Sequence, residues 1–356
     1  MDRHAKALAL LRQGTVIPAI PLALTEDRTF DEAHQRRLVR YYMAAGSGGV
    51  AAAVHSTQFE IRDPKYGMFE PVLRCVAEEM DRFEQENDTT LVRISGVCGP
   101  TDQACREAAL ARDLGYDAVL LSPGGLNGWS EAQLLARTAA VAEIMPVVGF
   151  YLQDAVGGKK LSKDYWRRLA DIPNVVAIKC ACFDRYRTQD LVKGVMESSR
   201  ADEVTLYTGN DDHIILDLLT PFSCTVNGET KIKWFQGGLL GQWSVWTHTA
   251  VRIFEDCVKC RETGRIPQSL LTTAEHLTEC NGAVFDVANR FAGCIPGLHY
   301  VLQQQGLMAG TWCLNPDEVL SAGQAEEIDR VRAAYPEITD DAFVQSFLAA
   351  DAALHS

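Results

Sequence analysis

The sequence of 356 residues lacks several features that would assign it to a large class of proteins. No apolar run approaches the ~18 residues that a membrane-spanning helix needs. The short apolar run Ala7–Leu11 ends at Arg12, and no cleavage site follows, so a secretory signal is not expected. Positive charge is also scarce, because 34 Lys and Arg stand against 47 Asp and Glu. The net charge of -13 repels phosphate, so we expect no nucleic-acid or membrane partner and a cytoplasmic location.

Several catalytic and metal-binding motifs are absent as well. There is no H-E-x-x-H, no G-x-S-x-G, and no G-x-G-x-x-G after the first apolar run. The 11 cysteines are odd in number, and the C-x-x-C pair Cys257 and Cys260 lies in a helical pattern without a second pair at zinc spacing. We therefore expect reduced thiols and no metal site.

Short apolar runs recur along the chain, mostly roughly thirty residues apart, which is about the length of one βα unit. Helical patterns lie between them. The predicted strands are Thr15–Ile20, Gly49–Val54, Leu91–Val97, Ala118–Ser122, Pro146–Tyr151, Val175–Lys179, Val204–Thr208 and, for the eighth, Lys231–Gln236 or Gly241–Val245. The predicted helices include Asp31–Ala45, Asp102–Leu114 with Thr101 as its N-cap, Ser130–Ile144, Ser162–Ala170 and Asp211–Leu219.

Strands that alternate with helices favour a parallel sheet covered by helices, and eight units favour its closure into a barrel. We predict a (β/α)8 TIM barrel over residues 1–242. Residues 243–356 are expected to hold the last barrel helix and a C-terminal helical extension. An open, doubly wound sheet is the competing fold.

Lys179 is the strongest candidate for chemistry. In a barrel, side chains at the carboxyl ends of the strands face the active site. Lys179 follows the run Val175–Ile178, which is typical of a strand buried on both faces. Burial lowers the pKa of a lysine, and the neutral amine is the form that attacks a ketone. The alternative is an ordinary lysine at a strand end, in an ion pair or in solvent.

Four further polar residues lie at predicted strand ends. Tyr151 ends the fifth strand, where a phenol would relay protons to an adduct on Lys179 unless it serves only for packing. His55, after the second strand, is an acid/base candidate, although a lone histidine is often structural. Ser56 and Thr57 would offer donors to a carboxylate, or simply cap the loop.

Taken together, these segments resemble the dihydrodipicolinate synthase / N-acetylneuraminate lyase family. The resemblance rests on segments 173–179, 149–151 and 207–211, and on a helical tail with Ile295-Pro296, Gly306-Leu307 and Leu314-Asn315-Pro316. It implies that Lys179 forms a Schiff base and that Tyr151 transfers protons. It also implies that Gly209 and Asn210 belong to the substrate site, that the protein is a homotetramer or another homo-oligomer, and that no metal or organic cofactor is needed.

The sequence departs from the family pattern at three places. The family's second loop usually reads G-T-T-G-E, whereas this chain has His55 where the synthase has a proton-relaying threonine. Gly124 and Gly125 stand where the synthase has an aromatic pair, and the segment from Val156 to Gly158 lacks the usual arginine. We therefore expect a reaction other than the lysine-biosynthetic one.

The sequence predicts a class I aldolase or lyase that acts on pyruvate or a related 2-oxo acid. Two alternatives stay open: a dehydratase of keto-deoxy sugar acids in the same family, and a barrel without catalysis that serves for ligand binding or assembly. The aromatic-rich segment Ser223–Trp246 is longer than expected and is given no role.

Overall fold

The computed structural model describes residues 2–355 of the chain. These residues form two compact units. Of the described residues, the first unit comprises 2–15 and 92–239, and the second comprises 16–91 and 240–355. The boundary that the sequence predicts between residues 242 and 243 separates the barrel from the C-terminal helices, and it stays a prediction.

The first unit contains a parallel sheet in the strand order β3-β4-β5-β6-β7-β10. Its strands are β3 (Val92–Val97), β4 (Ala118–Leu121), β5 (Val147–Leu152), β6 (Val175–Ala181), β7 (Thr205–Thr208) and β10 (Phe235–Leu240). Its helices are α1 (Arg3–Gln13), α4 (Thr101–Asp113), α5 (Glu131–Ala142), α6 (Lys163–Asp171), α7 (Arg185–Met196) and α8 (Ile214–Leu219), with the 3-10 turn η3 (Asp154–Val156).

The second unit holds β1 (Val16–Pro18) and β2 (Gly49–Ala52), the two ends of the strand order. A parallel bridge joins Ala19 to Ala51, and the Ile20 N–H donates to the Ala51 carbonyl at 2.9 Å. The strand order and the likeness to solved structures confirm the predicted (β/α)8 barrel with C-terminal helices. The other elements are α2 (Glu32–Ala44), η1 (His55–Thr57), η2 (Phe59–Arg62), α3 (Phe69–Asn87), η4 (Gln242–Ser244), α9 (Thr247–Thr263), α10 (Gln268–Val284), η5 (Val287–Asn289), α11 (Cys294–Gln304), α12 (Gln324–Ala334) and α13 (Asp341–His355).

The start of two barrel helices follows directly from local side chains. Ser130 and Ser162 accept hydrogen bonds from the backbone N–H groups three residues later and cap α5 and α6, as the sequence predicted. The predicted N-cap at Thr101 is wrong. Pro100 occupies the cap position and Thr101 is already the first helical residue of α4. A threonine that is already helical does not hold the extended backbone from which an N-cap side chain accepts a first-turn N–H.

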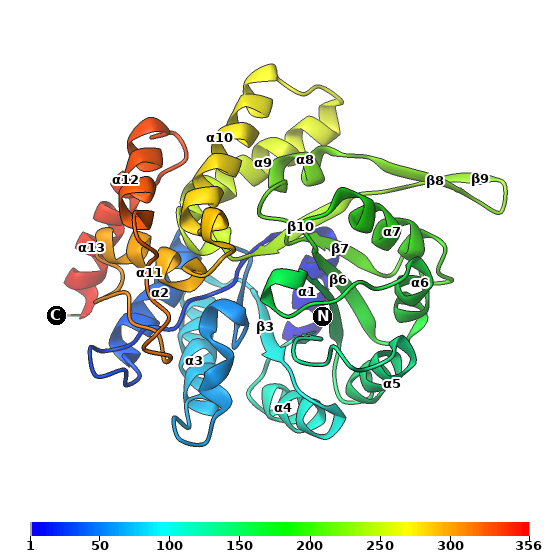
Figure 1. The fold of residues 1–356 in the computed structure, drawn as a ribbon, viewed down its shortest axis with the longest axis horizontal. Coiled ribbons are helices and arrows are strands. Elements are labelled where there is room, and N and C mark those ends of the chain that lie inside the picture. The colour runs from blue at the N-terminus through cyan, green and yellow to red at the C-terminus, as the bar shows by residue number, and fades with distance from the viewer. Residues whose placement is uncertain (1, 356) are drawn as a thin grey trace. The chain divides into compact units, whose positions relative to one another are not determined.

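The first seven predicted strands are confirmed, but the region of the eighth differs from the prediction. β10 begins at Phe235, inside the first predicted range, and runs to Leu240, whereas the rival range Gly241–Val245 is wrong because it holds η4. An antiparallel hairpin, β8 (Phe222–Val226) with β9 (Glu229–Lys233), precedes β10 and extends away from the sheet of the first unit (Figure 1). Asn227 and Gly228 both have positive φ, 51° and 85°. This Asn-Gly pair is the sequence signal that the strand prediction overlooked.

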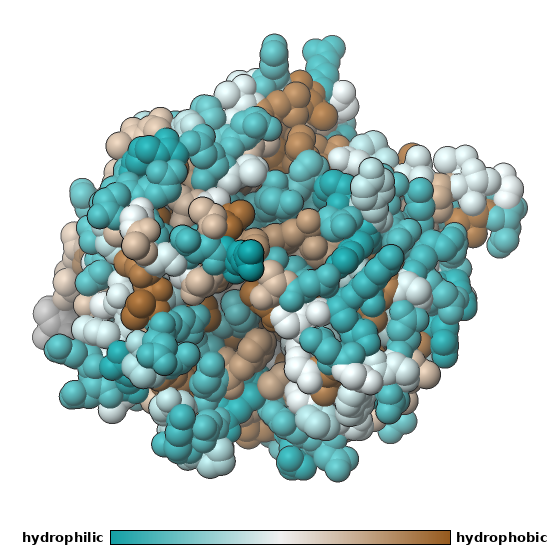
Figure 2. Space-filling model, viewed as in Figure 1, coloured by the Kyte–Doolittle hydropathy of each residue, from teal (hydrophilic) through white to brown (hydrophobic). Residues whose placement is uncertain are grey.

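The surface view shows mainly hydrophilic residues, with apolar side chains over the turn between α9 and α10 (Figure 2). The exposed large apolar residues of that region are Ile266 and Leu271. Within residues 2–355, no helix combines the length and the apolar character that crossing a bilayer requires.

Candidate active site

The centre of the candidate site is the carboxyl end of β6. Strand register pairs Lys179 with Phe150 of β5 on one side and with Tyr207 of β7 on the other. Paired residues of parallel neighbours point to the same face of a sheet, so these three side chains share one face. Lys179 is only 8% exposed, and its Nζ lies 4.6 Å from the centroid of the Phe150 ring. An aliphatic and aromatic environment therefore surrounds most of the amine.

This environment changes the acidity of the amine. Burial lowers the pKa of Lys179 to about 8, and the field of the Asp211 carboxylate opposes that shift only in part. At pH 7 roughly a tenth of such amines is uncharged, whereas an exposed lysine is almost wholly protonated. The uncharged amine is the form that can act as a nucleophile.

Gly209 leaves the space that the Lys179 side chain occupies. A Cβ atom at position 209 would lie 2.5 Å from Lys179 Cε and 2.8 Å from Ala181 Cβ. Both distances are well below van der Waals contact, so any larger residue would displace the lysine. The structure thus brings Gly209 and Lys179 together, two of the residues that the sequence assigned to the site.

Tyr151 lies on the opposite face of the strands, against the helices. Register pairs it with Cys180 rather than with Lys179, and its ring packs on Trp166 of α6 with centroids 4.7 Å apart. The phenol oxygen accepts a hydrogen bond from the Leu161 N–H at 3.4 Å, and burial raises its pKa to about 12. Register therefore places Tyr151 and Lys179 on opposite faces, because successive side chains of a strand alternate between its two faces. The catalytic role of Tyr151 stays a prediction.

Asn210 also belongs to the helix-facing side. Its amide donates to the Asp217 carboxylate at 2.9 Å, and its carbonyl oxygen accepts from the Phe183 N–H at 3.0 Å. Asp217 is fully buried and also binds the Thr208 hydroxyl at 2.7 Å. This arrangement ties the loops after β6 and β7 together. These contacts give the Asn210 side chain a structural role, and its expected part in substrate binding stays a prediction.

The residues predicted after the second strand lie in the second unit, on η1. The Ser56 hydroxyl donates to the Ala19 carbonyl at 2.6 Å, and the Thr57 hydroxyl donates to the Ile20 carbonyl at 2.7 Å. The Thr57 N–H donates to the Val54 carbonyl at 3.0 Å, which closes the 3-10 turn. Both hydroxyls therefore anchor the loop to the chain after β1. His55 is half-buried beside the Phe59 ring, with centroids 5.9 Å apart.

The loop after β4 is open, as its two glycines suggest. A Cβ atom at Gly125, where φ is 77°, would have no neighbour within 4 Å. Val156 closes the short turn η3 after β5. Among residues 2–355, no group of three or more His, Cys, Asp and Glu side chains is arranged to hold a metal ion.

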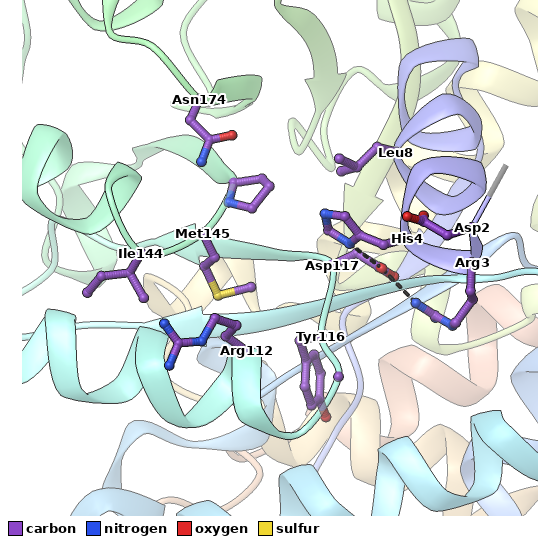
Figure 3. A pocket seen from close by; sticks show the side chains of 12 residues that line it. Asp2, Arg3, His4, Leu8, Arg112, Tyr116, Asp117, Ile144, Met145 and Asn174 are labelled. Atoms are coloured by element: carbon purple, nitrogen blue, oxygen red, sulfur yellow. Dashed lines mark hydrogen bonds and ion pairs between the residues drawn. The ribbon is translucent and has the colours of Figure 1, made fainter.

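A separate cavity of about 680 Å³ lies at the other end of the strands of the first unit (Figure 3). Its lining includes the residues that directly precede β4, β5 and β6, which are Asp117, Pro146 and Asn174. The Asp117 carboxylate oxygen Oδ1 lies 2.6 Å from Arg3 Nη1 and 3.0 Å from His4 Nδ1. These contacts hold α1 against this end of the unit. In barrel enzymes this end serves stability, whereas catalysis uses the carboxyl ends, where Lys179 lies.

The fold and Lys179 together define a class: (β/α)8 barrels that carry a buried lysine at the carboxyl end of the sixth strand. Comparison with known proteins agrees. Residues 12–333 match the model of the dihydrodipicolinate synthetase family. The chain is 24% identical over 307 residues to an N-acetylneuraminate lyase of Citrobacter koseri, covering 85% of this chain and 90% of that protein.

Solved structures show the same fold. A dihydrodipicolinate synthase of Bacillus anthracis has a TM-score of 0.71 at 19% identity, covering 90% of this chain and 98% of that one. A prophage protein of the same family from E. coli K12, in complex with pyruvate, has a TM-score of 0.72 at 17% identity, covering 91% and 98%. The chain belongs to the dihydrodipicolinate synthetase family, whose members are class I aldolases and lyases.

Proposed function

We propose that this protein is a lyase or aldolase that forms a Schiff base between Lys179 and a small 2-oxo acid such as pyruvate. The observation that carries the proposal is the state of Lys179, buried at the carboxyl end of β6 with its pKa lowered to about 8. The pyruvate bound to the similar E. coli prophage protein supports the choice of substrate class.

The proposed chemistry starts with attack of the neutral Lys179 amine on the C2 ketone. The carbinolamine that results loses water and becomes a protonated imine, which accepts the electron pair when a carbon–carbon or carbon–oxygen bond breaks. Phe150 beside the amine keeps water away from it but offers no proton. We assign the acid/base role to His55, and we assign carboxylate binding to the backbone of the loop with Ser56 and Thr57.

The reaction we propose is not the lysine-biosynthetic one. Gly124, Gly125 and Val156 stand where the synthase has an aromatic pair and an arginine, and register places Phe150, without a hydroxyl, beside Lys179. Cleavage and dehydration of a keto-deoxy sugar acid are then the two candidate outcomes. Product analysis with such acids separates them, because only cleavage releases pyruvate.

Trapping with borohydride tests the Schiff base directly. The full-length protein is incubated with pyruvate and sodium borohydride, digested, and mapped by mass spectrometry. A stable reduced adduct is expected on Lys179, and it should disappear in Lys179→Ala. Failure to trap any of a broad panel of 2-oxo acids in folded protein would overturn the proposal.

Lys233 provides a matched control. Burial also lowers its pKa to about 8, but its amine donates to the Ala201 carbonyl at 2.5 Å, in the hairpin β8–β9 rather than at a strand end of the barrel. We expect no adduct on Lys233 and normal labelling of Lys179 in Lys233→Ala. Equal labelling of both lysines would mean that a low pKa is sufficient for labelling. It would contradict the proposal that the residues around Lys179 form a substrate site.

We also propose that the protein is a cytoplasmic homo-oligomer, a dimer or tetramer, as the family resemblance implies. Light scattering coupled to size-exclusion chromatography measures the mass of the assembly. A monomer across the micromolar range would contradict this part of the proposal.

A further inference from the structure

Two thiols follow the candidate nucleophile on β6. Cys180 is the next residue after Lys179, and Cys182 lies just beyond Ala181, the last residue of the strand. Their sulfur atoms are 3.8 Å apart. Both side chains point toward the helix-facing side, since Cys180 pairs with Tyr151. The two cysteines therefore form a preassembled pair one residue away from the amine.

Hydroxyl, amide and carbonyl groups hold this pair in place. The Thr188 hydroxyl of α7 lies 3.7 Å from Cys180 Sγ and 3.4 Å from Cys182 Sγ. The Asn210 amide donates to Cys180 Sγ at 3.8 Å, and the Cys182 thiol lies 3.4 Å from the Asp184 carbonyl. Such contacts are more than two buried hydrophobic thiols would need for packing.

The two thiols are chemically unequal. The hydrogen bonds that Cys182 receives, first from Cys180 and then from Thr188, lower the pKa of Cys182. Burial raises the pKa of Cys180 well above its ordinary value. Cys182 also keeps 5% of its surface exposed, whereas Cys180 is completely buried. Acidity and access thus select the same sulfur, Cys182, as the one that reacts first with an oxidant.

We propose that Cys180 and Cys182 form a redox-sensitive modification site, which hydrogen peroxide or a related peroxide closes to an intramolecular disulfide. The Cys182 thiolate attacks one peroxide oxygen, and the O–O bond breaks to give a sulfenic acid and hydroxide. The Cys180 thiol then attacks the sulfenic sulfur, and water leaves as the disulfide forms. A thiol restores the pair by exchange.

The geometry allows the bond to form through a local movement. The sulfur atoms must approach from 3.8 Å to about 2.05 Å. Cys182 lies outside β6, and the next residue, Phe183, has φ of 52°, so the chain turns there and leaves the strand. The movement withdraws sulfur from Thr188 and Asn210 and changes the end of β6, which positions Lys179. Oxidation should therefore slow imine formation, a consequence that rests on the proposed function.

The experiment treats full-length, reduced protein with hydrogen peroxide and maps the thiols by mass spectrometry after alkylation. We expect the peptide that carries Cys180 and Cys182 to lose two hydrogens and to resist alkylation until dithiothreitol is added. Borohydride trapping of pyruvate on the oxidised protein should be about tenfold slower, because a small displacement of a reacting group is costly. Dithiothreitol should restore it.

Cys182→Ser and Cys180→Ser, checked for folding by thermal melting, should abolish the disulfide and the slowing, and trapping by each reduced variant should stay near that of wild type. The control is Cys260→Ser, at the C-x-x-C pair of α9, whose other thiol, Cys257, has its pKa raised to about 12 by burial. It should oxidise between Cys180 and Cys182 as wild type does. The disulfide is read by mass, so it is tested even if pyruvate never reacts with Lys179.

Two outcomes would overturn the inference. One is a protein whose Cys180 and Cys182 stay alkylatable after peroxide, or are found only as separate higher oxides. The other is a Cys182→Ser variant that peroxide slows as much as it slows wild type, since another site would then be responsible.

Discussion

The two faces of the β5–β6–β7 end differ in chemistry although their residues alternate along the same strands. One face carries Phe150, Lys179, Tyr207 and Gly209. Its single buried amine lies beside the Phe150 ring, and its side chain fills the space that Gly209 leaves. The helix-facing side carries Asn210 and other polar groups, and hydrogen bonds join them to Asp217. One face carries the proposed nucleophile Lys179, whereas hydrogen bonds to Asp217 stabilise the other.

The comparison shows how much depends on a single step along a strand. Tyr151 and Phe150 are neighbours, yet only Phe150 faces Lys179. A shift by one residue in an alignment exchanges the two faces, because the side-chain period of a strand is two. The position of Tyr151 in the sequence, next to Phe150, therefore does not place its phenol beside Lys179.

The largest effect on the reactive face is expected from Gly209→Ala. The added methyl group would lie 2.5 Å from Lys179 Cε and must displace the lysine, and a displacement of about 1 Å can cost about 100-fold in rate. Borohydride trapping rates measure the loss. Gly128→Ala is the control, because a Cβ there has no neighbour within 4 Å. Normal trapping by Gly209→Ala would show that the face has no tight site.

On the rigid face, Asp217→Ala should reduce stability rather than reactivity. The substitution removes the carboxylate that accepts hydrogen bonds from Thr208, Asn210 and Arg185. The Arg185 Nη1 atom lies 2.8 Å from Asp217 Oδ1. We expect a loss of about 3 kcal/mol in the free energy of unfolding, measured with urea. Asp190→Ala, at an exposed position of α7, should stay within about 0.5 kcal/mol of wild type. Equal losses in the two variants would contradict the distinction between the faces.

The pH dependence should report the reactive face alone. Trapping is expected to rise about tenfold per unit toward pH 8 and to level off above it, because the neutral amine reacts. The pKa of Lys179 is lower in the folded state, so the unfolded chain binds more protons between about pH 8 and 10.5. Burial of this lysine therefore costs stability below pH 8, and that cost falls as the pH rises through the window. Lys179→Met should remove both effects, and a flat trapping profile would refute the assignment.

The smallest effect is expected from Tyr151→Phe. The change removes one hydrogen bond of 3.4 Å to the Leu161 N–H and leaves the packing on Trp166. Trapping and turnover should change by less than about threefold, since a proton relay would be worth at least about 100-fold. A larger loss in turnover, without a loss in stability, would return Tyr151 to the catalytic machinery.

Much of the fold was predictable because it depends on local patterns. Apolar runs located seven strands, and Ser130 and Ser162 marked the start of two helices. The hairpin β8–β9 was missed although Asn227-Gly228 signals a tight turn. The regular spacing of βα units led us to predict the eighth barrel strand at Lys231–Gln236, which overlaps β9. The observed strand β10 begins at Phe235, four residues after the predicted start.

The site divides in the same way. The sequence by itself predicted the family and the barrel. It also pointed to Lys179 as the proposed nucleophile, since the buried run before Lys179 and its place in the chain order are local features. Only the tertiary structure decided that Phe150 faces Lys179, that Tyr151 and Asn210 face the helices, and that Gly209 makes room for the amine. The physical reason is that register between strands decides which residues share a face. Register depends on the packing of the whole sheet, which no single strand encodes.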